Sequence, residues 1–249
     1  MAGLFGRFFG RREGNSAPAP IAVDMPPIAV DHPFVAIGDI HGCDDLLERL
    51  LSKLAIEAPD AELVFVGDYI DRGEQNAEAL RRLMQLEDAT VLLGNHERMC
   101  LDFIDHPEEK GPRWLRYGGL QTLASFGVSG SPKNSVGLRD GLVAAMGEEM
   151  INWLRDLQLS YSNGNIHVVH AGADPDKPIE AQSEKALIWG HSRFGKQPRR
   201  DKFWVVHGHT IVDMPQVSRG VVSIDTGAYA TGRLSAAIFA GNDVQFIQG

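Results

Sequence analysis

One short stretch of the chain combines two carboxylates with a guanidinium. It runs Gly67-Asp68-Tyr69-Ile70-Asp71-Arg72-Gly73 and follows an apolar run at residues 63–66, which we predict to be a buried strand. The flanking glycines allow the backbone to turn sharply. Asp68 and Asp71 are hard oxygen ligands or proton carriers, and Arg72 is a planar donor that fits phosphate. We therefore expect metal and phosphate chemistry at this strand end.

Two neighbouring strand ends carry similar side chains. The predicted strand at residues 34–37 ends in Gly38-Asp39-Ile40-His41-Gly42, and the one at residues 90–93 ends in Gly94-Asn95-His96-Glu97. In extended chain, Asp39 and His41 point to the same side. Amphipathic helices predicted from Asp44 and over residues 76–86 would connect the strands into a parallel sheet. Ligands bind at the carboxyl ends of strands in such sheets, so we expect one shared site.

Further strands are predicted at residues 165–169, 203–206 and 221–224, followed by His170, His209 and Asp225. An antiparallel hairpin is predicted at residues 234–247. Five strand ends thus supply six candidate metal ligands: Asp39, His41, Asp68, Asn95, His170 and His209.

One metal cannot use all six ligands and still keep open positions. Two metals can, at a spacing of about 3.5–4 Å, if a carboxylate bridges them. Asp68 is the expected bridge because its strand lies between the other two. We assign Asp39, His41 and Asp68 to the first metal, and Asp68, Asn95, His170 and His209 to the second. Oxygen and imidazole ligands favour manganese, iron or zinc.

His96 is the predicted proton donor to the leaving group, because its side chain titrates near neutral pH. Asp71 would hold the imidazole in one tautomer, and Arg72 would bind phosphate oxygens. Alternatives remain open: His96 and Asp71 could support the metals instead, and Arg72 could form an ion pair with Asp71 or Glu97.

The composition limits the classes of protein to which the chain can belong. With 249 residues and 43% hydrophobic content, the chain can form one α/β domain or two small ones. A net charge of -9 argues against broad nucleic-acid binding, and no run is long enough for membrane insertion. Two cysteines outside any pair motif indicate a reducing, cytoplasmic setting. We predict a flexible tail and Pro-rich linker at residues 1–32, a domain over residues 33–249, and a helical cap in the middle of the chain.

Together, the three glycine-flanked motifs resemble the signature motifs of the phosphoprotein phosphatase (PPP) family. The later His170-Ala171-Gly172 and Gly208-His209-Thr210 are similar to its remaining metal histidines, and the chain resembles the bacterial and phage branch of lambda-type serine/threonine protein phosphatases. This resemblance implies a metallophosphoesterase αββα sandwich with mixed sheets and a pair of divalent metal ions. It also implies hydrolysis of phosphoserine and phosphothreonine in proteins by direct attack of metal-activated water, with His96 and Asp71 as the acid pair.

The chain departs from this branch at the second phosphate-binding arginine. Its sequence there is Ile188-Trp189-Gly190-His191-Ser192-Arg193, with His191 at the expected arginine position. We therefore keep both His191 and Arg193 as candidate phosphate contacts, beside Arg72 and Asn95.

Two other functions stay open. A related branch cleaves dinucleoside tetraphosphates symmetrically, although it often has Gln at the position of His41. A non-catalytic module that binds phosphoproteins is disfavoured, because Asp68, Asn95 and His96 are all present. We expect phosphorylated proteins or small phosphoesters as partners.

Overall fold

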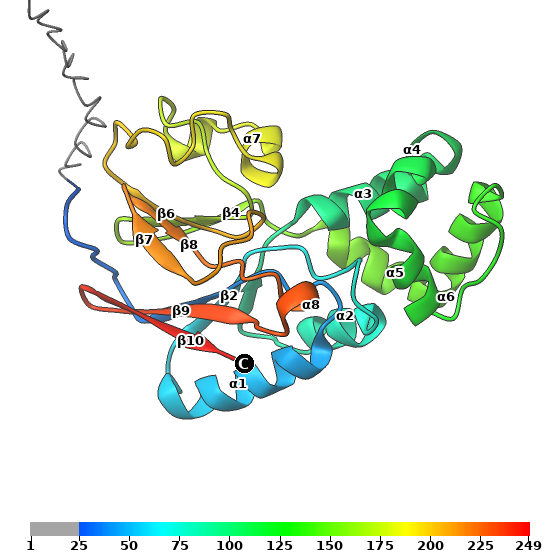
Figure 1. The fold of residues 1–249 in the computed structure, drawn as a ribbon, viewed down its shortest axis with the longest axis horizontal. Coiled ribbons are helices and arrows are strands. Elements are labelled where there is room, and N and C mark those ends of the chain that lie inside the picture. Colours follow the sequence, from blue (N-terminus) through cyan, green and yellow to red (C-terminus); the bar gives the residue numbers. More distant parts are fainter. Residues whose placement is uncertain (1–24) are drawn as a thin grey trace, which may run out of the picture.

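The structure is a computed structural model that describes residues 25–249 (Figure 1). The first part of the predicted tail, residues 1–24, lies outside the described residues. Among those described, no helix has the length and apolarity needed to cross a membrane.

The first sheet contains the three parallel strands predicted from the glycine-flanked motifs. Its order is β10-β9-β1-β2-β3, with β9 antiparallel to β1. Helices α1 and α2 connect these parallel strands, so the carboxyl ends of β1, β2 and β3 lie at one edge. The element bounds are β1 Phe34–Ile37, α1 Asp44–Glu57, β2 Glu62–Phe65, α2 Asn76–Met84, β3 Ala89–Val91, β9 Ser235–Ala240 and β10 Asp243–Gln248.

The second sheet has the order β4-β5-β6-β8-β7. The predicted strands β5, β6 and β8 are parallel, and the antiparallel strands β4 and β7 lie at its edges. These edge strands were not predicted, because their sequences, Ser-Tyr-Ser-Asn and Gln-Val-Ser, are short and largely polar. The bounds are β4 Ser160–Asn163, β5 Ile166–Val169, β6 Trp204–His207, β7 Gln216–Ser218 and β8 Val221–Ser223.

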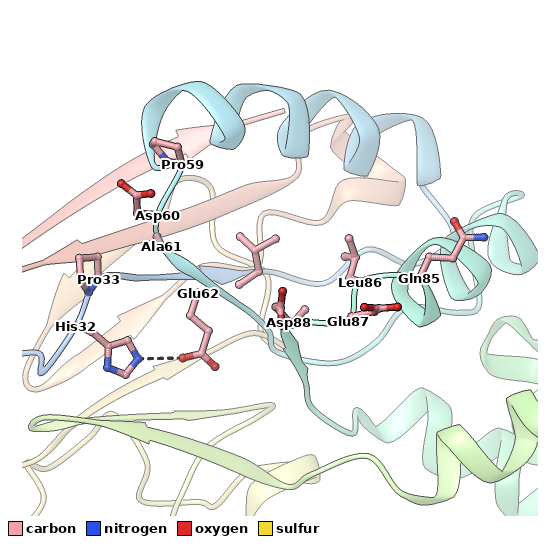
Figure 2. A pocket seen from close by; sticks show the side chains of 12 residues that line it. His32, Pro33, Pro59, Asp60, Ala61, Glu62, Gln85, Leu86, Glu87 and Asp88 are labelled. Carbon is pink, nitrogen blue, oxygen red and sulfur yellow. Dashed lines mark hydrogen bonds and ion pairs between the residues drawn. The ribbon is translucent and has the colours of Figure 1, made fainter.

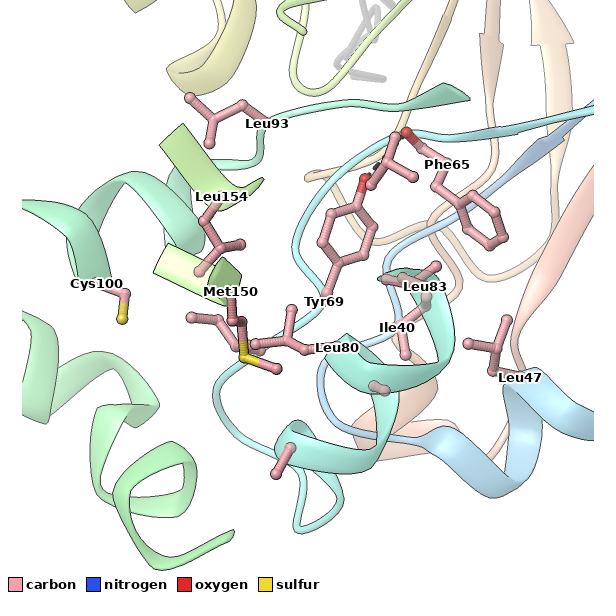
Figure 3. Close-up of a cluster of buried hydrophobic side chains, with 14 of the residues drawn as sticks. Ile40, Leu47, Phe65, Tyr69, Leu80, Leu83, Leu93, Cys100, Met150 and Leu154 are labelled. Atoms are coloured by element: carbon pink, nitrogen blue, oxygen red, sulfur yellow. Dashed lines mark hydrogen bonds between the residues drawn. The ribbon is translucent and has the colours of Figure 1, made fainter. Parts of the chain in front are cut away.

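The two sheets pack face to face, with helices outside each of them. Alternate residues of β1 show this arrangement: Phe34 and Ala36 pack toward the second sheet, whereas Val35 and Ile37 pack with α1 and α2. Figure 3 shows part of the core under these helices, where Leu47 of α1 and Leu80 and Leu83 of α2 share one cluster with Ile40 and Tyr69. Helix α7 (Glu184–Trp189) packs on the outer face of the second sheet. The predicted αββα sandwich is confirmed.

The middle of the chain forms the helical cap that we predicted, at one side of the sandwich (Figure 1). The helical chain of the cap is broken at Gly118, where φ is 123°. A later helix begins at Ser135 and is interrupted at Gly147, where φ is 77°. The cap contains α3 Asn95–Asp105, α4 Pro107–Trp114, η1 Leu115–Gly119, α5 Leu120–Ser125 and α6 Ser135–Arg155. Short turns elsewhere are η2 Ile179–Ala181 and α8 Ala228–Thr231.

The described part of the predicted linker is fixed to the second sheet. Ile28 is buried, the Ala29 N–H donates to Asn165 Oδ1 at 2.9 Å, and the Asp31 N–H donates to Asn163 Oδ1 at 2.7 Å. Packed chain therefore begins before the boundary that we predicted at Pro33. Backbone donors bonded to distant asparagines leave no hydrophobic pattern in the sequence, so the boundary could not be read from composition.

Candidate active site

The loops that carry the predicted site residues have an unusual backbone. Five of these residues adopt positive φ: His41 (45°), Asp68 (56°), Asp71 (73°), Arg72 (71°) and His209 (63°). This conformation is uncommon for residues other than glycine, and it concentrates at functional sites where the surrounding structure holds it in place. Backbone strain at this one edge of the sheets is therefore a second, independent sign of a site.

Glu97 holds the loop that follows β2. Its carboxylate is fully buried and accepts four backbone N–H groups, from Asp68 (2.9 Å), Tyr69 (2.7 Å), Ile70 (3.2 Å) and Gly94 (3.1 Å). Three of these donors belong to the loop that follows β2, so one carboxylate fixes that loop to the start of α3. We had not assigned Glu97 a role of its own, since these three donors lie about thirty residues away in sequence.

Asp68 lies between two groups of candidate ligands. In one group, His41 Nε2 is 3.6 Å from Asp68 Oδ2. In the other, His170 Nε2 is 3.3 Å from Asp68 Oδ1, and the His209 ring packs against that of His170 with centroids 5.1 Å apart. The candidate ligand atoms of Asp68, His170 and His209 all lie within 4.8 Å of one another, as do those of His41, Asp68 and His96. Each carboxylate oxygen of Asp68 thus faces a different histidine.

The hydrogen bonds of the histidines indicate that cations belong here. His41 Nδ1 donates to the Ile70 carbonyl at 2.8 Å and His170 Nδ1 donates to the Val66 carbonyl at 3.1 Å, so Nε2 of each neutral ring has a free lone pair. His170 Nε2 then faces two acceptors, Asn95 Oδ1 at 2.9 Å and Asp68 Oδ1 at 3.3 Å. A proton or a metal ion among these atoms removes their repulsion, and the donor set fits a divalent metal.

Asp39 is the remaining residue of the predicted ligand set. Its Oδ2 accepts the His209 N–H at 2.9 Å, while its buried Oδ1 has no hydrogen-bond partner within the described residues. Burial, together with Asp225 and Asp68, raises the pKa of Asp39 well above its usual value. A buried carboxylate oxygen without a donor is costly, and a cation beside it would offset that cost. Asp39 therefore fits the first metal position.

The pKa values of the ligands also suit metal binding. Burial lowers the pKa of His41 to about 3, and burial with His170 nearby lowers the pKa of His209 to about 4. Burial alone would raise the pKa of Asp68, but His170 and His96 hold it well below its usual value. At neutral pH the site therefore offers neutral imidazoles and an ionised carboxylate, the forms that bind metals.

His96 and Asp71 form a buried pair beside these ligands. His96 Nδ1 lies 2.6 Å from Asp71 Oδ2, and His96 Nε2 lies 3.9 Å from Asp68 Oδ2. Burial opposes protonation of His96, but Asp68 and Asp71 outweigh it and raise its pKa. The raised pKa favours a protonated imidazole, as an acid requires.

Two cap residues hold Asp71, and sequence reasoning missed both. The Trp114 indole N–H donates to Asp71 at 3.0 and 3.1 Å, and the Thr122 hydroxyl donates to Asp71 Oδ1 at 2.6 Å. At Gly118 the cap approaches the turn that carries Asp71 and Arg72. A Cβ at position 118 would lie 2.6 Å from the backbone nitrogen of Arg72. No local pattern marks these contacts, since they form only when the cap closes on the strand end.

Arg72 forms neither of the two ion pairs that we had left open. Its Nη2 donates to His96 Nε2 at 3.2 Å, and its Nη1 donates to the Tyr229 hydroxyl at 3.2 Å. Because a guanidinium only donates, His96 Nε2 is the acceptor here and Nδ1 carries the proton shared with Asp71. Arg72 thus lies against His96, and none of the carboxylates within residues 25–249 is paired with it.

His191 and Arg193 are placed differently. His191 and His209 line one cavity of about 370 Å³, together with Trp189 and Thr210. Arg193 is exposed and pairs with Asp174 and Asp176, and it does not line this cavity. Both residues lie near Asp174, since His191 Nε2 is 4.0 Å from Asp174 Oδ2, but only His191 shares a cavity with the candidate ligand His209.

A larger cavity of about 690 Å³ lies at the opposite edge of the first sheet, beside the amino ends of β2 and β3 (Figure 2). His32 and Glu62 form an ion pair of 3.0 Å there, and Asp60, Glu87 and Asp88 make the lining acidic. Acidic side chains repel phosphate, so this cavity does not compete with the strand-end site as a place for a phosphoester.

Residues 32–213 match the family described as calcineurin-like phosphoesterase. The chain belongs to this family. The resemblance to phosphoprotein phosphatases is thereby confirmed, and the chain is a metallophosphoesterase-type hydrolase, of a family that uses divalent metal ions.

Named relatives differ in the substrates that their names state. The chain is 29% identical to serine/threonine-protein phosphatase 2 of Salmonella typhimurium, over 80% of this chain and 89% of that protein. It is 28% identical to the asymmetrical bis(5'-nucleosyl)-tetraphosphatase PrpE of Oceanobacillus iheyensis, over 82% and 87% of the two chains. It is also 34% identical to a symmetrical bis(5'-nucleosyl)-tetraphosphatase of Janthinobacterium sp., over 56% of this chain but only 43% of that one.

The fold is shared with solved structures. A crystal structure of a putative diadenosine tetraphosphatase matches with a TM-score of 0.63 and 23% identity, covering 88% of this chain and 94% of that one. The chain spans less than half the length of the symmetrical tetraphosphatases that it matches. The comparisons therefore establish family and fold and leave the substrate to be tested.

Proposed function

We propose that the protein is a metal-dependent phosphomonoesterase that removes phosphate from phosphoserine and phosphothreonine residues of proteins. The observation that carries the proposal is the position of His96. Its Nε2 lies 3.9 Å from the carboxylate shared by both ligand groups, while its Nδ1 is held by Asp71. A proton donor next to a divalent metal centre is what ester cleavage at phosphorus requires.

Asp39, His41 and Asp68 would hold one cation, and Asp68, Asn95, His170 and His209 the other. Bound there, the cations supply an activated water and neutralise charge on the phosphoryl group. The geometry supports Asp68 as the shared ligand, since each of its oxygens faces a different histidine. Asn95 would face the cation with Oδ1, which lies 2.9 Å from His170 Nε2, and would contact phosphate through its Nδ2 amide donor.

Arg72 and His96 would then act in sequence. Phosphate oxygens replace His96 Nε2 as the acceptor for Arg72 Nη2, which frees Nε2 to carry a proton. Protonated His96 donates that proton from Nε2 to the leaving ester oxygen, and Asp71 stabilises the imidazolium through Nδ1. Electrostatics supports this order, because Arg72 opposes protonation of His96 while it sits on the ring.

His191 is our candidate for the second phosphate contact, in place of the missing arginine. It lines the same cavity as His209, whereas the guanidinium of Arg193 is paired with two aspartates. An imidazole has fewer donors than a guanidinium, so this contact would be weaker than the bidentate contact of an arginine.

Hydrolysis of dinucleoside tetraphosphates is a second candidate. Relatives named for it match the chain about as well as the protein phosphatase of Salmonella typhimurium does. The same ligand set could serve either reaction, because both place one phosphorus atom at the metal centre.

The two candidates are separated by assaying the manganese-loaded protein on a phosphothreonine peptide and on diadenosine tetraphosphate. We expect phosphate release from the peptide with the higher kcat/KM. A higher kcat/KM on the dinucleotide, giving two ADP or one ATP and one AMP, would replace the first proposal with the second. Activity on neither substrate would contradict both. The His96→Asn variant is the control, since it should lose whichever activity is found.

A further inference from the structure

Tyr229 lies on the short helix α8, beside the candidate phosphate arginine. We infer that Tyr229 is a positioning residue that holds the Arg72 guanidinium ready for phosphate. The inference rests on the proposed function, in which Arg72 binds the phosphoryl group. It concerns a residue outside the metal-binding motifs and the acid pair.

Tyr229 contacts Arg72 in two ways. Its hydroxyl accepts from Arg72 Nη1 at 3.2 Å, and its ring centroid lies 4.9 Å from Arg72 Cζ. The second contact falls within the range of a cation–π interaction. The ring also packs edge-on against His41, with centroids 5.3 Å apart and planes at 84°. One side chain therefore bridges the candidate phosphate arginine and a candidate metal ligand.

Arg72 has few other contacts that could hold it. Within residues 25–249, Arg72 forms no ion pair with a carboxylate, and its side-chain hydrogen bond besides the one to Tyr229 goes to His96 Nε2. That bond must break when phosphate oxygens become the acceptors of Arg72 Nη2. Tyr229 is then the contact that persists, so it would keep the guanidinium in place throughout turnover and reduce the ordering cost of binding phosphate.

The segment that carries Tyr229 is itself braced. Helix α8 lies between Gly227 and Gly232, both in the left-handed conformation. The Thr231 hydroxyl donates to the Thr226 carbonyl at 2.7 Å, and the Thr226 hydroxyl donates to the Arg233 carbonyl at 2.7 Å. Both hydroxyl groups bond to backbone carbonyls of the same segment, which fixes its backbone. The partly exposed ring of Tyr229 therefore extends from a fixed backbone.

The test is a double-mutant cycle on phosphate binding. Isothermal titration of inorganic phosphate into manganese-loaded protein would compare wild type with Tyr229→Ala, Tyr229→Phe, Arg72→Ala and the Tyr229→Ala/Arg72→Ala double variant. We expect Tyr229→Ala to weaken phosphate binding about tenfold and Tyr229→Phe by less, because Phe keeps the ring over the guanidinium. In the Arg72→Ala background, Tyr229→Ala should have no further effect. In kinetics, Tyr229→Ala should raise KM more than it lowers kcat.

Equal weakening by Tyr229→Ala in both backgrounds would refute the inference while leaving Arg72 as a phosphate ligand. Unchanged phosphate affinity in Arg72→Ala would instead remove Arg72 from the proposed function, and the inference with it. Metal content and melting temperature of each variant are measured alongside, and Tyr229→Phe keeps the test decisive if the alanine variant does not fold. Tyr161→Phe is the matched control, since this tyrosine hydroxyl bonds Glu62 at the opposite end of β2 and should leave phosphate affinity unchanged.

Discussion

Replacing Thr122 with valine should impair catalysis from within the cap. The Thr122 hydroxyl donates to Asp71 Oδ1 at 2.6 Å and accepts the Asp71 N–H at 3.0 Å, and the side chain is fully buried. Valine has nearly the same shape as threonine but can do neither. The substitution therefore isolates two hydrogen bonds without opening a large cavity.

The magnitude follows from the kind of bond that is lost. A hydrogen bond to a charged group contributes about 1.5–3 kcal/mol, and a buried N–H left without an acceptor costs about 1–3 kcal/mol. We expect Thr122→Val to lower the free energy of unfolding by about 2–4 kcal/mol, since the two effects share one site. If about half of this free energy comes from the contact with the ionised Asp71, which holds His96, kcat should fall about tenfold or more, because each 1.4 kcal/mol in the activation free energy is a factor of ten in rate.

The assay compares kcat and metal content of wild type, Thr122→Val and Thr122→Ser. Serine keeps the hydroxyl and loses only a methyl group, so Thr122→Ser should stay close to wild type in both. Metal content should be unchanged in all three proteins, because Thr122 contacts no candidate ligand. A Thr122→Val protein that is folded, metal-loaded and fully active would refute the reasoning that the cap supports His96 through Asp71.

Three other predictions follow from the same contacts. His96→Asn should lower kcat by about 10²–10⁴ with metal content unchanged, and undiminished turnover would remove His96 from the acid role. Glu97→Gln should lower the free energy of unfolding by about 2–4 kcal/mol in chemical denaturation, because one of the oxygens that accepts backbone N–H groups becomes a donor; equal stability would contradict its bracing role. Burial lowers the pKa of His167, so as the pH falls the unfolded chain binds this proton before the folded chain does, and the free energy of unfolding should decrease below about pH 6.5. His167→Phe, which can keep the stacking on Phe203, should weaken this pH dependence. An unchanged pH dependence would contradict the assignment to His167.

The sequence was informative wherever one short segment carries both the strand and its ligands. Asp39, Asp68 and Asn95 each follow an apolar strand within a few residues, and a parallel sheet must bring such ends to one edge. The order β1-β2-β3 confirms that the strand before Asp68 is the middle one. Local pattern and tertiary placement therefore agree in bringing Asp39, Asp68 and Asn95 to one edge of the sheet, and their role as ligands stays a prediction.

Prediction ended where function depends on contacts between distant segments. Trp114 and Thr122 support Asp71 across about fifty residues, and Tyr229 reaches Arg72 across 157. The polar strands β4 and β7 lie at sheet edges, where neighbours rather than hydropathy decide their conformation. The positive φ values at Asp68, Asp71 and Arg72 were equally hidden, because these residue types give no glycine-like signal.

Metal stoichiometry tests the central claim most directly, since everything depends on Asp68 serving two cations. Elemental analysis of protein reconstituted with manganese and freed of excess metal should give two ions per chain for wild type and at most one for Asp68→Asn. Two ions retained by Asp68→Asn, or fewer than two bound by the wild-type protein at saturation, would contradict the shared-carboxylate site on which the proposed chemistry rests.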